Sequence, residues 1–139
     1  MDFDLDRFVS AQDGGGTYDA ALRELRAGRK TSHWMWFVFP QIAGLGQSEM
    51  ARAYAIRSLE EARAYLAHPV LGPRLLECTR ALAALEGRSA EDVLGPVDAM
   101  KLRSSMTLFA AAAPQEPLFH TVLEAFFDGR EDPATLERL

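Results

Sequence analysis

Along most of this 139-residue chain, apolar residues recur at three- and four-residue spacing, which is the period of an amphipathic helix. Residues 18–25 follow this pattern and stop before a glycine, the residue type that most often closes a helix. Ser58 and Glu61 fit a capping box that opens another helix, and Pro69 ends it. The first half of the chain therefore predicts helices with defined ends.

The second half continues the helical pattern, again with capping residues at the segment ends. Its predicted segments are residues 71–85, a shorter turn capped by Ser89, a long helix from Asp98 to Ala113, residues 118–127, and a terminal helix that begins at Asp132-Pro133.

No long stretch alternates apolar and polar residues, as a half-buried strand would. Only residues 34–39 are short and aromatic enough for a strand, and a single strand would lack a hydrogen-bonding partner. We therefore predict an all-α fold. A 139-residue chain with 48% hydrophobic residues fits one domain over residues 1–139. We expect a compact bundle of about seven or eight short to medium helices.

Composition narrows the classes of function. The net charge of −5 and the pI near 5.2 oppose general nucleic-acid binding, which requires a basic surface. Cys78 is the only cysteine, so an internal disulfide is excluded, and the few thiolates and histidines point to no metal site and no cofactor. We expect Cys78 to be buried as a small apolar residue.

The sequence indicates a cytoplasmic protein with no membrane segment. The acidic start MDFDLDRF lacks the basic and apolar regions of an export signal. Residues 31–48 contain no Asp, Glu, Lys or Arg and are nearly long enough to span a bilayer. However, Pro40, Gln41 and two glycines break this run.

The same uncharged segment, TSHWMWFVFPQIAGLGQS, is the first candidate for a functional site. Its aromatic residues would bury a large apolar area, and we expect residues 34–39 to contribute to the principal core. Yet His33 and Gln41 lie among them and need polar partners if they are buried. Apolar walls with a few convergent polar groups are typical of a ligand pocket.

Two clusters of cations and hydroxyls flank apolar sequence. Lys30 and Ser32 precede the aromatic run, and Lys101, Ser104 and Ser105 form a second cluster. Ammonium and hydroxyl donors suit a phosphate or carboxylate, so we predict that both clusters lie around one pocket. In the alternative interpretation, the first cluster only follows a helix end, where cations are favoured and Ser32 caps the next helix.

Trp34 and Trp36 could stack on a nucleobase, or they could fill the core. Residues two apart do not share a helix face, so at most one of them would meet a ligand. His33 is the candidate general acid–base because its titration lies near neutral pH; its alternative role is that of a hydrogen-bonding residue.

Most of the chain resembles a small bacterial domain family of unassigned function, sometimes labelled calpastatin-like. The resemblance rests on GRKTSHWMWFVFPQIAGLGQSEMARAYAI, SLEEARAYLAHPVLGPRL and KLRSSMTLF. It implies a compact helical domain. A calpain inhibitor would be long and disordered, which the apolar content and capped helices contradict.

A second similarity, to the NADAR (YbiA-like) domains, is one of order. An aromatic block with His33 precedes an SLEEA helix start, and KLRSSMTLF then leads into LFHTVLEAFFDG. This resemblance implies N-glycosidic cleavage of nucleotide or ADP-ribose conjugates. Ser32 stands where a glutamate is expected beside the histidine in that family, which puts catalysis in doubt.

Two hypotheses follow. In the first, the chain binds a small anionic, phosphate-bearing or nucleotide-like ligand, and if it is an enzyme the reaction is a hydrolysis. In the second, it is a non-enzymatic module that uses an aromatic face to bind a protein or to form a homo-oligomer. A concave aromatic wall lined by both Lys–Ser clusters favours the first, and an exposed flat aromatic patch favours the second.

Overall fold

The computed structural model describes residues 3–139, and this part of the chain is helical, with one isolated β-bridge and no strand. The all-α prediction is confirmed. In chain order the elements are α1 (Asp6–Asp13), the 3₁₀ turn η1 (Gly14–Gly16), α2 (Thr17–Ala27), α3 (Met35–Val38), α4 (Glu49–Ala53), α5 (Leu59–Ala67), α6 (Leu71–Ala83), α7 (Ala90–Leu94), α8 (Pro96–Ala112), α9 (Leu118–Phe127) and α10 (Pro133–Leu136). No helix among these residues is long and apolar enough to cross a membrane.

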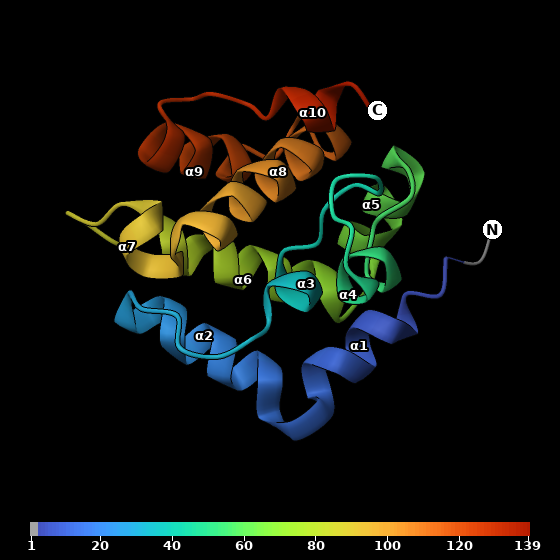
Figure 1. Ribbon diagram of the computed structural model, residues 1–139, viewed down its shortest axis with the longest axis horizontal. Helices are drawn as coiled ribbons and strands as arrows, with labels where there is room; N and C mark the ends of the chain where they lie inside the picture. The colour runs from blue at the N-terminus through green and yellow to red at the C-terminus, as the bar shows by residue number, and fades with distance from the viewer. Residues whose placement is uncertain (1–2) are drawn as a thin grey trace.

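Helix α6 occupies the middle of the molecule, with α1 and α2 on one side and α8 and α9 on the other (Figure 1). It can do so because one face of it is apolar: Leu71, Leu75, Cys78 and Leu82 are at most 1% exposed. The prediction that Cys78 lies on this buried stripe is confirmed. Burial also raises the pKa of the Cys78 thiol to about 12, which keeps it neutral.

The aromatic segment at residues 34–39 forms core, as predicted, but folds into the single helical turn of α3. Trp34, Met35, Val38 and Phe39 are at most 2% exposed. The chain then turns at Pro40 into a loop over residues 41–46. This loop is held by the isolated bridge between Ile42 and Ile56, with hydrogen bonds of 2.7 and 2.8 Å on either side.

The predicted helix ends are largely correct. Gly28 closes α2 with a φ of 76°, a left-handed conformation that favours glycine. The Ser58 side chain accepts a hydrogen bond from the backbone N–H of Glu61, and Ser89 and Asp92 form a complete capping box before α7. One prediction needs correction. Helix α8 begins at Pro96, so Asp98 lies inside its first turn and is not the cap.

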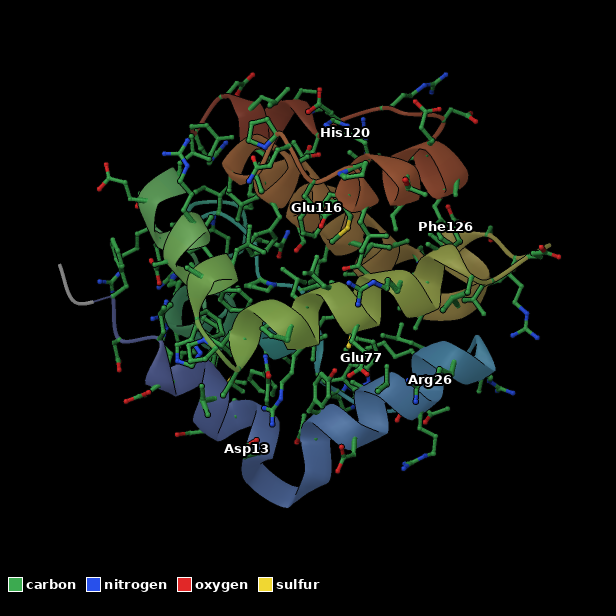
Figure 2. All side chains as sticks on the ribbon, turned by 180° about the vertical axis from the view of Figure 1, so that it is seen from behind. Asp13, Arg26, Glu77, Glu116, His120 and Phe126 are labelled. Atoms are coloured by element: carbon green, nitrogen blue, oxygen red, sulfur yellow. The ribbon has the colours of Figure 1, made fainter. Side chains whose placement is uncertain are left out.

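Figure 2 shows the molecule from behind, where Arg26 of α2 approaches Glu77 of α6. Their charged atoms are 3.7 Å apart and both side chains are exposed, so this ion pair contributes little to stability. The packing of α2 on α6 therefore depends on the apolar residues beneath it, such as Leu25 and Leu82.

Candidate functional site

The Glu24 carboxylate holds the loop that carries the first predicted cluster. Its Oε1 accepts the backbone N–H groups of Thr31 and Ser32 at 2.7 and 3.0 Å and the indole N–H of Trp34 at 2.9 Å. Its Oε2 accepts the Ser32 hydroxyl at 2.6 Å. Burial raises the pKa of Glu24, but these hydrogen bonds outweigh burial and lower it to about 2. Glu24 is thus an ionised structural clamp.

This clamp changes the roles of three predicted site residues. The Trp34 side chain is 0% exposed and its N–H is already bonded, which leaves no face of the ring for a ligand. The Ser32 hydroxyl is committed to Glu24. His33 is exposed and is not among the residues that line the cavity described below. The structure brings none of these three side chains to the cavity.

The two lysines do converge, although they are seventy-one positions apart in sequence. Lys30 Nζ lies 3.0 Å from Asp98 Oδ2, and Lys101 Nζ lies 3.5 Å from Asp98 Oδ1. Each ammonium also lies over an indole, Lys30 over Trp34 at 5.2 Å and Lys101 over Trp36 at 4.9 Å from the ring centroid. Cation–π attraction adds to the ion pairs in this geometry.

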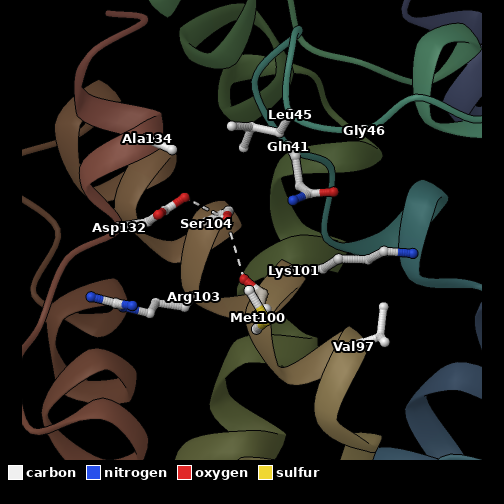
Figure 3. A pocket seen from close by; sticks show the side chains of 10 residues that line it. All are labelled: Gln41, Leu45, Gly46, Val97, Met100, Lys101, Arg103, Ser104, Asp132 and Ala134. Atoms are coloured by element: carbon white, nitrogen blue, oxygen red, sulfur yellow. Dashed lines mark hydrogen bonds between the residues drawn. The ribbon is translucent and has the colours of Figure 1, made fainter.

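A cavity of about 320 Å³ opens beside Lys101, along α8. We call it the α8 cavity. Three segments form its walls: the loop at residues 41–46, α8 itself, and the start of α10 (Figure 3). Its volume lies within the range of about 300–1,000 Å³ that is typical of ligand pockets. Its lining residues are Gln41, Leu45, Gly46, Val97, Met100, Lys101, Arg103, Ser104, Asp132 and Ala134.

One wall of the α8 cavity carries a carboxylate with two hydroxyls. Ser104 Oγ and Thr135 Oγ1 each donate a hydrogen bond to Asp132 Oδ2 at 2.6 Å. Burial raises the pKa of the Asp132 carboxyl, but the two hydroxyls, the Ala134 backbone and the charge of Arg103 together hold it below its ordinary value. Asp132 is therefore ionised at neutral pH and can accept hydrogen bonds from a ligand.

Two arginines fix the walls of the α8 cavity. The Arg103 guanidinium donates to the carbonyls of Arg130 and Glu131 at 2.8 and 2.7 Å, which ties the segment before α10 to α8. Arg138 donates to Ala134 at 2.8 Å and to Gly44 at 3.4 Å, so it bridges α10 and the 41–46 loop. The cavity is built by these long-range contacts.

The remaining predicted residues differ in their surroundings. Gln41 lines the α8 cavity, and in the described part of the chain its side-chain amide has no hydrogen bond. Ser105 is fully buried, and its Oγ has no partner among the described residues; the same holds for Trp36 Nε1. Three predicted residues, Gln41, Lys101 and Ser104, thus line one cavity. Lys30 does not line it and is linked to Lys101 only through their shared partner Asp98.

Sequence analysis missed Glu24 and gave other roles to Asp98 and Asp132. A signal for Glu24 exists: it lies three residues after Ala21, on the buried face of α2, where an unpaired carboxylate would be costly. Asp98 and Lys101 have the i, i+3 spacing of an ion pair. Within residues 3–139, no group of three His, Cys, Asp or Glu side chains could hold a metal ion.

The fold and the cavity define a small all-α domain with a lateral cavity beside its longest helix, α8. The chain belongs to the family described as "Protein of unknown function (DUF1810)", which matches residues 2–139. Among solved structures it is similar to the conserved hypothetical protein Rv1873 from Mycobacterium tuberculosis, with 53% identity and a TM-score of 0.95. The match covers 99% of this chain and 96% of the other. No curated protein matches the chain.

Proposed function

We propose that the protein binds a small phosphate-bearing, nucleotide-like ligand in the α8 cavity. The observation that carries this proposal is the convergence of Gln41, Lys101 and Ser104 on one concave site. Lys101 and Ser104 both belong to α8, whereas Gln41 comes from the loop at residues 41–46, far away in sequence. Polar groups that converge on an otherwise apolar cavity are what a small-molecule site requires.

Each polar group has a counterpart in such a ligand. The ionised Asp132 carboxylate and the Ser104 hydroxyl oxygen suit the hydroxyl groups of a sugar, because both can accept hydrogen bonds; the proton of Ser104 is itself donated to Asp132. The amide of Gln41 can donate to and accept from a base edge. Two cationic residues line the cavity, Lys101 and Arg103. Arg103 donates to backbone carbonyls, whereas the Lys101 ammonium does not in the described part of the chain, and this ammonium suits a phosphate.

The apolar part of the site suits the planar part of the ligand. Val97 and Met100 line the cavity, yet they are 66% and 72% exposed. Removal of apolar surface from water is favourable, so binding of a base or another planar group that covers these two side chains would be stabilised by their burial.

We further propose that, if the protein is an enzyme, it hydrolyses an N-glycosidic bond of this ligand. The similarity in order to the NADAR domains supports this reaction class. An ionised carboxylate of lowered pKa is a poor general base, but it stabilises the positive charge that develops on the sugar during glycosidic cleavage. Asp132 is the candidate for that role. His33 stays a prediction for the acid–base step, and the binding proposal does not depend on it.

The test is a thermal-shift and calorimetric screen with AMP, ADP, ADP-ribose and ribose 5-phosphate. A ligand at 100 times its dissociation constant stabilises the fold by about 2.7 kcal/mol, which raises Tm by several degrees. Lys101→Gln should weaken binding of the active compound by about 1.5–3 kcal/mol. Arg23→Gln, which removes the same charge from an exposed position on α2, is the control. If no phosphate-bearing compound binds at millimolar concentration, the proposal is wrong.

The exposed Val97 and Met100 also favour a second candidate, a module that associates with itself or with another protein through this face. Analytical ultracentrifugation between 10 and about 300 μM distinguishes the two, since a dimer with a stable interface would show a concentration-dependent mass in this range. Loss of that dimer in Met100→Gln, together with no binding in the ligand screen, would favour the second candidate.

A further inference from the structure

We infer that Asp98 competes with the ligand for Lys101: its carboxylate holds the ammonium outside the α8 cavity until an anionic ligand takes it. This inference rests on the proposed function and concerns the regulation of the same site.

The first observation is where Lys101 points. Its side chain lines the α8 cavity, but its ammonium is directed away from Ser104 and Asp132, toward α3 (Figure 3). The ammonium lies over the Trp36 ring and 3.5 Å from Asp98 Oδ1. A phosphate in the cavity can therefore use Lys101 only if the ammonium leaves Asp98.

The second observation is that Lys101 is the more weakly held of two lysines. Lys30 lies 3.0 Å from Asp98, with a side chain 9% exposed, whereas the Lys101 side chain is 23% exposed and its distance is longer. A lysine side chain has four rotatable bonds, so its ammonium can move without any backbone change. Lys101 is the lysine that can be released.

The third observation is that Asp98 remains paired when Lys101 leaves. The Asp98 side chain is only 19% exposed, so its carboxylate would be costly without a partner, and that cost would keep a single ion pair closed. Here Lys30 stays within 3.0 Å of the other carboxylate oxygen and neutralises it. The second lysine therefore lowers the free-energy cost of releasing the first. Lys30 acts on the ligand through Asp98, as a positioning residue, and touches nothing in the cavity.

This arrangement makes a prediction that a simple electrostatic field does not make. Removal of Asp98 alone would raise the affinity for an anion whether Asp98 competes for Lys101 or only contributes its negative charge to the local field. The double variant Lys30→Gln/Asp98→Asn has the net charge of the wild type and frees Lys101. It also removes Lys30, which lies over Trp34 with a side chain 9% exposed, so it avoids the folding defect that Asp98→Asn alone would cause by leaving this ammonium without a carboxylate.

The experiment measures affinities for AMP and for adenosine, its uncharged counterpart, by calorimetry at low salt. We expect the double variant to bind AMP about two- to fivefold more tightly than the wild type, the range for a partly exposed ion pair. Adenosine affinity should not change. Glu91→Gln and Arg29→Gln, at exposed positions without described side-chain contacts, control for single charge changes.

A second readout follows the lysine itself. The two indole N–H groups give separate NMR signals, and AMP should shift that of Trp36, from which Lys101 departs, more than that of Trp34. Wild-type AMP affinity in the double variant, with the Trp36 signal unmoved by AMP, would overturn the competition while the proposed function stands. If neither the wild type nor the double variant binds AMP, this inference falls together with AMP binding in the α8 cavity.

Discussion

Replacement of Glu24 by glutamine should destabilise the protein in a way that depends on pH. The carboxylate accepts four hydrogen bonds from the loop at residues 31–34 and is 7% exposed. Its pKa is lowered from 4.5 to about 2 in the folded state. A shift of this size corresponds to about 3 kcal/mol of folding free energy at pH 7, or about 2 kcal/mol if solvent screens part of it.

The sign follows from the lowered pKa. As the pH falls, the Glu24 carboxyl binds a proton near pH 4.5 in the unfolded chain but only near pH 2 in the folded protein. The stabilisation is therefore complete above about pH 5 and is lost as the pH falls toward 2. Glutamine cannot be ionised. The difference in unfolding free energy between the wild type and Glu24→Gln should shrink to about 1 kcal/mol at pH 3.

Urea unfolding followed by tryptophan fluorescence and circular dichroism measures this difference. Glu137→Gln, at an exposed position near the C-terminus, is the matched control and should behave as the wild type at each pH. A Glu24→Gln protein as stable as the wild type at pH 7, or a deficit that is the same at pH 7 and pH 3, would refute the role of the ionised carboxylate.

Two further predictions concern α6 and α8. Cys78 should react with a thiol reagent only as the protein unfolds, because the sulfur is fully buried and its pKa is near 12; rapid labelling of the native protein would contradict this. Ser104→Ala should cost about 1–3 kcal/mol in urea unfolding, since it removes a hydrogen bond to the ionised Asp132. Ser105→Ala should be neutral or slightly stabilising, because its buried hydroxyl has no described partner; equal losses in the two variants would contradict the assignment.

Local sequence signals predicted the helices well where a cap or a stop lies next to the apolar period. Gly28, Ser58 and Ser89 each act within four residues of the helix end that they define, so no tertiary information is needed. The start of α8 was placed at Asp98 because an aspartate is a common N-cap. Its side chain is instead used by Lys30 and Lys101, a long-range contact that the capping rule does not see.

The site was predicted only in part, because long-range contacts decide which side chains line it. The two Lys–Ser clusters were expected around one pocket because of their chemistry, and the structure brings the lysines together on Asp98. The sequence does not show which side of the backbone each side chain takes. The indole N–H of Trp34 and the hydroxyl of Ser32 donate to the buried Glu24 carboxylate, whereas Gln41 and Ser104 line the cavity. The wall formed by Asp132 and Ala134 is held in place by Arg103 of α8, a contact between residues far apart in sequence that local patterns do not reveal.

Binding in the α8 cavity can be tested by mapping the ligand onto the protein. In ¹H–¹⁵N correlation spectra recorded during a titration with AMP, we expect the largest shifts on the backbone amides of residues 41–46, 97–104 and 132–135, the three walls of the α8 cavity. Lys101→Gln should reduce these shifts. Spectra that do not change, or shifts that gather on the opposite face around Arg26 and Glu77, would contradict it.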